Sequence, residues 1–97
     1  MQEDEITMQE YAERSHTDIQ FINQLTEYGL IEIVIQQQVH YIPSHQLPLL
    51  EKYARLHYDL DINMAGIEAI SHLLQRVERM QNDMETMRRK LRLFDTL

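Results

Sequence analysis

The 97-residue sequence contains no cysteine and only two glycines, and these absences restrict what the protein can do. Without cysteine the chain has no disulfide, no zinc–thiolate site and no thiol nucleophile. Gly29 and Gly66 stand far apart, so no glycine-rich loop is available to hold a phosphate group. Three serines are present, but none lies in a recognisable nucleophile motif. We therefore do not expect an enzyme.

Long apolar runs are also absent. No stretch approaches the roughly 20 apolar residues that span a bilayer. The first five residues include three acids and no base, whereas a secretory signal would begin basic and then become apolar. Apolar residues make up 43% and charged residues 26% of the chain, which is typical of a folded protein. We expect a cytoplasmic protein with one small domain and an extension.

Lysine and arginine are missing from the whole stretch between Arg14 and Lys52. Residues 1–61 hold eleven acids and three bases, while residues 62–97 hold five acids and six bases. A negative surface repels nucleic acid and attracts a cationic protein surface. Solubility explains most of the acids, but it does not explain a contiguous stretch without bases.

Two short helices are predicted near the N-terminus. Thr7 and Glu10 have the spacing of a capping box that opens a helix ending near Arg14. Residues 17–20 form a second box, with Thr17 as its cap, and Gly29 ends the helix that follows. The apolar face of this second helix comprises Ile19, Ile22, Leu25 and Tyr28, and its polar face comprises Gln20, Asn23, Gln24 and Glu27. The pair predicts a helix-turn-helix.

A β-hairpin and a third helix are predicted next. β-Branched residues alternate over residues 30–36, residues 37–38 form a turn, and residues 39–42 return as the partner strand. Ser44 is expected to cap a third helix that runs to about Leu60, with Pro48 in its first turn. A helix-turn-helix followed by a hairpin, or wing, predicts a winged helix-turn-helix.

The last helix carries an unbroken heptad pattern. We expect Asn63 to cap it and Ile62 to pack against Ile67. Apolar residues then alternate at spacings of three and four: Ile70, Leu73, Val77, Met80, Met84, Met87, Leu91 and Phe94. This apolar seam is typical of a coiled coil. At about 1.5 Å per residue it is roughly 35 Å long, more than a small head can cover.

The seam therefore predicts a homodimer, with folding back onto the same chain as the alternative. The expected architecture is mainly α, with a winged helix-turn-helix head at residues 1–61 and a dimerisation helix at residues 62–97. Methionine at three of the eight seam positions packs adaptably and specifies the register poorly. We expect a modest dimer affinity.

This layout resembles the MerR family, in which a winged helix-turn-helix precedes a helical linker and a dimerising helix. The matching segments are residues 6–15, TEYGLI at residues 26–31 and YIPSHQLPLLEKYARL at residues 41–56. Within that family the chain is similar to chaperone modulators of the CbpM type. That likeness rests on RLHYDLDINMAGIEAISHLLQRVERM at residues 55–80 and on QLPLLEKYARL just before it.

The resemblance implies a small dimer that binds the J-domain of a DnaJ-type co-chaperone and inhibits its stimulation of the Hsp70 ATPase. A J-domain engages Hsp70 through a basic helix, so an acidic protein that covers this helix would compete with Hsp70. No cofactor is implied.

The expected partner-binding residues are Asp18, Gln20, Phe21, Gln24, Glu27 and Glu32. Phe21 lies off the apolar face of its helix, so it is either an exposed aromatic anchor or a core residue beneath the wing. The face has more amides than acids, and electrostatic contacts would therefore depend on Asp18, Glu27 and Glu32.

The main alternative is a DNA-binding transcription regulator. Glutamine and asparagine can pair with adenine, but DNA binding also requires cations that neutralise phosphates. The nearest bases are Arg14, Lys52 and Arg55. The basic cluster at residues 88–92 lies at the far end of the helix, where cations complement the helix dipole. A dimerisation scaffold that binds neither DNA nor a J-domain is a third possibility.

His40 and His45 flank Pro43 in a loop, with no acid at ligand spacing beside them. We expect all five histidines to be ordinary surface residues, so no metal site is predicted.

Overall fold

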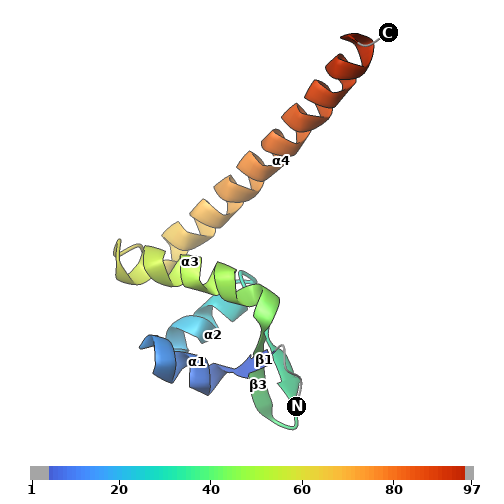
Figure 1. The fold of residues 1–97 in the computed structure, drawn as a ribbon. Coiled ribbons are helices and arrows are strands. Elements are labelled where there is room, and N and C mark those ends of the chain that lie inside the picture. The colour runs from blue at the N-terminus through green and yellow to red at the C-terminus, as the bar shows by residue number, and fades with distance from the viewer. Residues whose placement is uncertain (1–4, 96–97) are drawn as a thin grey trace.

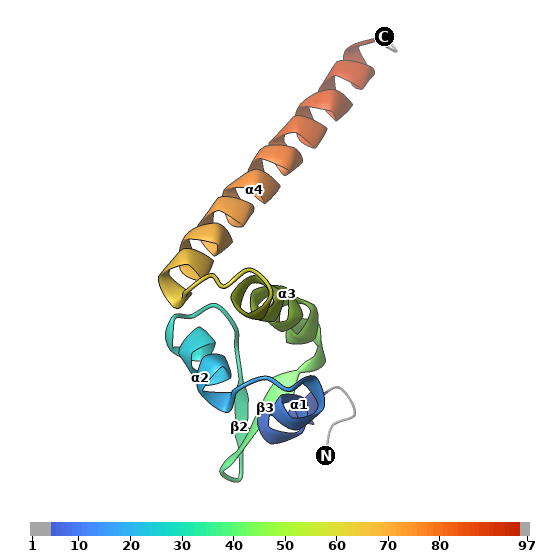
Figure 2. The ribbon, with the colours of Figure 1, turned by 90° about the vertical axis from the view of Figure 1, so that its left-hand side faces the viewer.

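The computed structural model describes residues 5–95 and consists of a small head and one long helix (Figures 1 and 2). The head contains, in order, β1 (Glu5–Thr7), α1 (Met8–Ser15), α2 (Ile19–Glu27), β2 (Val34–Gln36), β3 (Val39–Pro43), the 3-10 turn η1 (Ser44–Gln46) and α3 (Leu47–Tyr58). Helix α4 (Met64–Asp95) has 32 residues and leaves the head as a straight arm. The molecule measures 58 × 34 × 21 Å. The mainly helical fold with a small sheet and a long C-terminal helix is confirmed.

Both short helices begin at side-chain caps. Thr7 Oγ1 accepts the backbone N–H of Glu10 at 3.0 Å, which confirms the first predicted cap. The second cap is Asp18 rather than Thr17, because Asp18 Oδ1 accepts the backbone N–H of Gln20 at 2.9 Å. Thr17 cannot take this place because it is buried and its hydroxyl is bonded to Ser15. The predicted end of α2 is confirmed by Gly29, whose φ of 73° suits glycine.

The sheet has three antiparallel strands in the order β1-β3-β2. The predicted first strand is too long, because regular pairing covers only Val34–Gln36 and the preceding Leu30 and Ile31 turn into the core. The predicted hairpin turn is confirmed at Gln37 and Gln38, which both have positive φ, as a two-residue turn of type I′ requires. Strand β1 was not predicted, since three residues before a helix show no alternation.

The core lies between the three short helices and the sheet. Its fully buried side chains are Ile22, Leu25, Ile42, Leu50 and Ile67. Ile22 and Leu25 confirm part of the predicted inner face of α2, but Ile19 and Tyr28 are 40% and 45% exposed. The inner face is rotated because α2 also packs beneath the end of α3, and this contact buries Phe21.

Helix α3 starts differently from the prediction. Ser44 does not cap it, because the chain first forms η1 and α3 then follows without a side-chain cap. Pro48 lies in the first turn as predicted. The cap of α4 is confirmed, since Asn63 Oδ1 accepts the backbone N–H of Gly66 at 2.8 Å. A Cβ atom at Gly66 would lie 2.7 Å from Ile62 Cγ2, so glycine allows the chain to pack tightly at this joint.

One buried polar pair joins α4 to the head. The hydroxyl of Tyr53 on α3 donates to Ser71 Oγ on α4 at 3.2 Å, and both residues are buried. We predict that Ser71→Ala lowers the free energy of unfolding by about 1–3 kcal/mol, because the tyrosine hydroxyl loses its partner in the interior. Urea denaturation measures the loss. The double variant Ser71→Ala/Tyr53→Phe removes both groups and should recover part of it; a single variant as stable as the wild type would contradict the prediction.

Candidate functional site

Three of the predicted binding residues, Asp18, Gln20 and Gln24, lie along one groove of the head. Phe21 lies beneath them. Glu27 is exposed one turn further along α2, and Glu32 is exposed in the loop that leads to β2. The structure therefore brings four of the six residues together and leaves Glu27 and Glu32 outside the groove.

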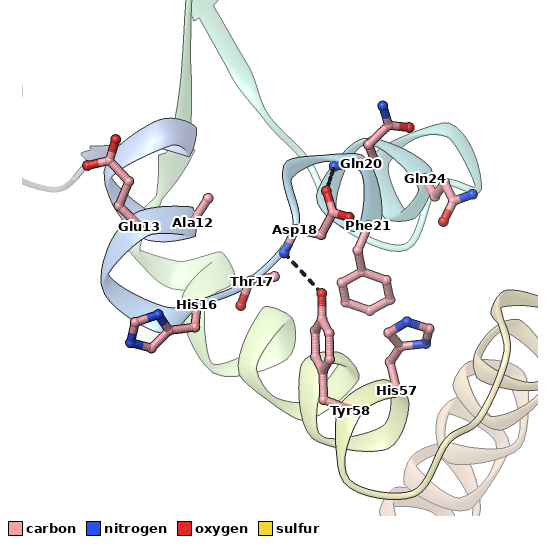
Figure 3. A pocket seen from close by; sticks show the side chains of 10 residues that line it. All are labelled: Ala12, Glu13, His16, Thr17, Asp18, Gln20, Phe21, Gln24, His57 and Tyr58. Carbon is pink, nitrogen blue, oxygen red and sulfur yellow. Dashed lines mark hydrogen bonds between the residues drawn. The ribbon is translucent and has the colours of Figure 1, made fainter.

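This α2–α3 groove runs between the turn that joins α1 to α2 and the C-terminal end of α3 (Figure 3). It has a volume of about 590 Å³. Its lining residues are Ala12, Glu13, His16, Thr17, Asp18, Gln20, Phe21, Gln24, His57 and Tyr58. His57 and Tyr58 were not predicted as site residues, because their approach to α2 depends on tertiary packing.

Three rings form the inner wall of the groove (Figure 3). Phe21 stacks on His57 with a centroid distance of 4.5 Å and an interplanar angle of 12°. Tyr58 meets Phe21 edge-on at 5.6 Å. Phe21 is only 3% exposed, whereas Tyr58 is 48% exposed. The prediction of Phe21 as an exposed anchor is thus wrong: Phe21 belongs to the core beneath the end of α3, and Tyr58 presents the accessible ring.

Hydrogen bonds fix the two sides of the groove to each other. The backbone N–H of Asp18 donates to the hydroxyl oxygen of Tyr58 at 3.0 Å. The carboxylate of Asp18 caps α2, so its position is also set by the helix. His57 Nδ1 donates to the carbonyl oxygen of Ile62 at 3.0 Å, which ties the end of α3 to the loop before α4. The groove is therefore an ordered feature of the head.

The groove is acidic. Glu13 and Asp18 line it, and no lysine or arginine does so among residues 5–95. Arg14 instead forms an ion pair with Glu10 at 3.8 Å on the surface of α1. Arg55 lines a neighbouring groove together with Glu51 and Asp59, and Lys52 is exposed elsewhere on α3. The described residues thus form no positive rim around α2.

The wing surface is a second concave region, between the hairpin, the start of α1 and the start of α2. It is lined by Thr7, Met8, Gln9, Ile19, Gln38, Val39 and His40. In a helix-turn-helix protein the N-terminal residues of the second helix approach the DNA bases. Here that position is occupied by Ile19, which is partly exposed beside Val39. The surface presents the exposed apolar side chains of Ile19 and Val39 among polar ones, and within the described chain no lysine or arginine lines it.

The apolar seam of α4 is exposed. The fractional exposure of Leu73, Val77, Met80, Met84, Met87, Leu91 and Phe94 lies between 47% and 74%. Only Ile70, close to the head, is half-buried. The head does not cover the seam, so folding back onto the same chain is not observed in residues 5–95.

Burial raises the pKa of the Tyr11 hydroxyl, a shift that the Glu51 carboxylate reinforces and a hydrogen bond with Ser15 opposes. The raised pKa favours the neutral phenol, which suits a structural residue in the core rather than an acid–base catalyst.

Residues 5–95 contain no group of three or more histidine, aspartate and glutamate side chains that is arranged to hold a metal ion. Within the same range, none of the helices combines the length and the apolar character needed to cross a membrane.

The structure combines a helix-turn-helix, a wing and a long C-terminal helix, which is the arrangement of a winged helix-turn-helix protein. The sequence matches the profile of the MerR HTH family regulatory proteins over residues 6–89, which covers the head and most of α4. The chain therefore belongs to the MerR HTH family, whose members are in general non-enzymatic regulators or binding proteins. No curated protein and no solved structure gives a significant match.

Proposed function

We propose that this protein is a dimeric adaptor that binds the J-domain of a DnaJ-type co-chaperone and inhibits its stimulation of Hsp70. The observation that carries the proposal is the missing positive charge on the face that would lie along DNA. Between Arg14 and Lys52 there is no lysine or arginine, and this stretch includes all of α2 and the wing.

The chemistry of that face suits a protein better than a nucleic acid. Binding to DNA depends largely on cations that neutralise phosphates. The exposed side of α2 instead carries Gln20, Asn23, Gln24 and Glu27, and the nearby wing surface carries apolar side chains. Exposed apolar groups bordered by polar and acidic groups are typical of surfaces that bind proteins.

Inhibition follows from competition for one basic helix. The CbpM-type resemblance suggests that the partner is a J-domain, which uses a basic helix to engage Hsp70. An acidic head attracts that helix, and complementary charge accelerates the encounter. While the head covers the helix, the J-domain cannot present it to Hsp70.

Dimerisation through α4 is part of the proposal. The exposed seam would be covered if two copies of α4 paired along it, as heptad patterns in other coiled coils do. The resulting dimer would carry two heads and therefore two binding surfaces.

Binding of the full-length protein to an isolated J-domain tests the proposal. We expect binding by calorimetry that weakens as salt is added, and reduced stimulation of Hsp70 ATPase activity. Glu27→Lys should lower the affinity by about three- to tenfold, because it places a cation against the basic helix. Lysine at the C-terminal end of α2 suits the helix dipole, so the head should stay folded.

Glu78→Lys, on α4 and outside the seam, makes the same charge change and should leave the affinity nearly unaltered. If no binding occurs at low salt, this function is wrong.

DNA-binding regulation is the second candidate. The amide side chains on α2 favour it, because glutamine and asparagine can pair bidentately with adenine. A gel shift with DNA at low salt, together with no binding to the J-domain, would support this candidate instead.

A further inference from the structure

We infer that the α2–α3 groove binds an arginine side chain presented by a basic helix of the protein partner. The inference takes its class of partner from the proposed function. It places the arginine in the groove between α2 and the end of α3, one turn of α2 away from Glu27.

The groove offers an arginine both an anion and an aromatic surface. Asp18 Oδ1 accepts the backbone N–H of Gln20, and within the described chain no partner is bonded to Oδ2. This second oxygen can accept an N–H from a guanidinium. The nearly half-exposed ring of Tyr58 stands in the same groove and can stack on the guanidinium plane.

Amide groups complete the lining. Gln20 and Gln24 are exposed along the α2 side of the groove, and their side-chain oxygens can accept further guanidinium N–H groups. Arginine has five such donors in a planar arrangement, whereas lysine has a compact ammonium group. A groove that combines a carboxylate, two amides and a ring therefore matches arginine better than lysine.

The exposed ring is held in place before any partner binds. The hydroxyl oxygen of Tyr58 accepts the N–H of Asp18 at 3.0 Å, and its ring contacts both Phe21 and His57 edge-on. Side chains that are already ordered lose little conformational entropy on binding. Exposed tyrosines of this kind are common among the residues that dominate protein interfaces.

No cation of the described chain occupies the groove. Arg14 lies against Glu10 on α1, and Arg55 lies in the neighbouring groove. The acids Glu13 and Asp18 are consequently left without a basic partner in the groove. A lysine or arginine bound in this groove would therefore come from another molecule.

A titration with N-acetyl-arginine amide tests the site directly in the full-length protein. We expect chemical-shift changes in NMR spectra at Tyr58, Gln20 and Gln24, with an affinity in the millimolar range for a single side chain. N-acetyl-citrulline amide has nearly the same shape but no charge, and it should cause little change. Equal effects of both compounds, or changes confined to other parts of the chain, would overturn the inference.

Two matched double variants test the groove against the J-domain. Asp18→Asn keeps the cap of α2, since asparagine caps as well as aspartate, and Glu13→Gln removes the second charge. We expect this pair to lower J-domain affinity by about tenfold or more, because these two carboxylates give the groove its negative charge. Glu32→Gln/Glu78→Gln removes the same charge outside the groove and should change the affinity by less than about twofold.

The outcomes separate the two proposals. If both double variants lose the same amount of J-domain affinity, the arginine contact does not lie in the groove. The proposed function would still stand, because the wild-type protein would still bind the J-domain. Selective shifts with the arginine amide and no J-domain binding would support the groove and reject the proposed function.

Discussion

Replacing both Val77 and Met84 by aspartate is expected to disrupt the homodimer that we propose forms along α4. Both residues lie in the middle of the seam and are about half exposed in the single chain. In a paired coil they would face their counterparts, and burial of carboxylates without partners is strongly unfavourable. We expect the dimer affinity to fall by about a hundredfold or more. Analytical ultracentrifugation over a range of concentrations measures the change.

Gln75→Asp/Asn82→Asp provides the control for this variant. It adds two aspartates to the same helix at positions opposite the seam, so dimerisation should persist. The aspartates at the seam should also reduce the helix content measured by circular dichroism, because most helical stability in proteins comes from packing of the apolar face. A wild-type protein that sediments as a monomer at high concentration would reject the dimer.

Phe21→Ala is expected to lower the free energy of unfolding of the head by about 3–5 kcal/mol. The ring is 3% exposed and stacks on His57 at 4.5 Å, so its removal leaves a cavity between α2 and α3. A small domain has little more stability than this to lose, and much of the head should then unfold. Thermal and urea denaturation measure the effect.

Ile19→Ala is the matched control because Ile19 lies on the same helix but is 40% exposed. It should cost no more than about 1 kcal/mol. If both variants had equal stability and only Phe21→Ala weakened partner binding, Phe21 would be an anchor and its assignment to the core would be wrong.

The parts of the fold that the sequence predicts correctly depend on local chemistry. Thr7 and Asn63 accept backbone N–H groups within their own first turn, and Gly29 supplies the positive φ that ends α2. Gln37 and Gln38 form the two-residue turn that brings β2 and β3 together. Such signals extend over a few residues and can be recognised without knowledge of the tertiary structure.

The parts that it does not predict depend on contacts between distant segments. The burial of Phe21 requires α3 to end above α2, and the exposure of Ile19 follows from the same rotation of α2. The pairing of β1 with β3 and the wall of the α2–α3 groove arise in the same way. For this reason the carboxylate and amides of the groove were anticipated, while His57 and Tyr58 were not.

A small change of angle at the joint between Ile62 and Gly66 would move the far end of α4 a long way. A helix of 32 residues at about 1.5 Å per residue is roughly 48 Å long, so a tilt of about 5° at its base moves its tip by about 4 Å. A sideways displacement of that size is nearly half of the roughly 8–10 Å between the axes of packed helices, and it would misalign two seams that meet near the tip. The direction of α4 relative to the head therefore depends on the tight packing of Ile62 over Gly66 and on the Tyr53–Ser71 hydrogen bond. Substitutions at this joint would alter self-association without touching a single residue of the seam.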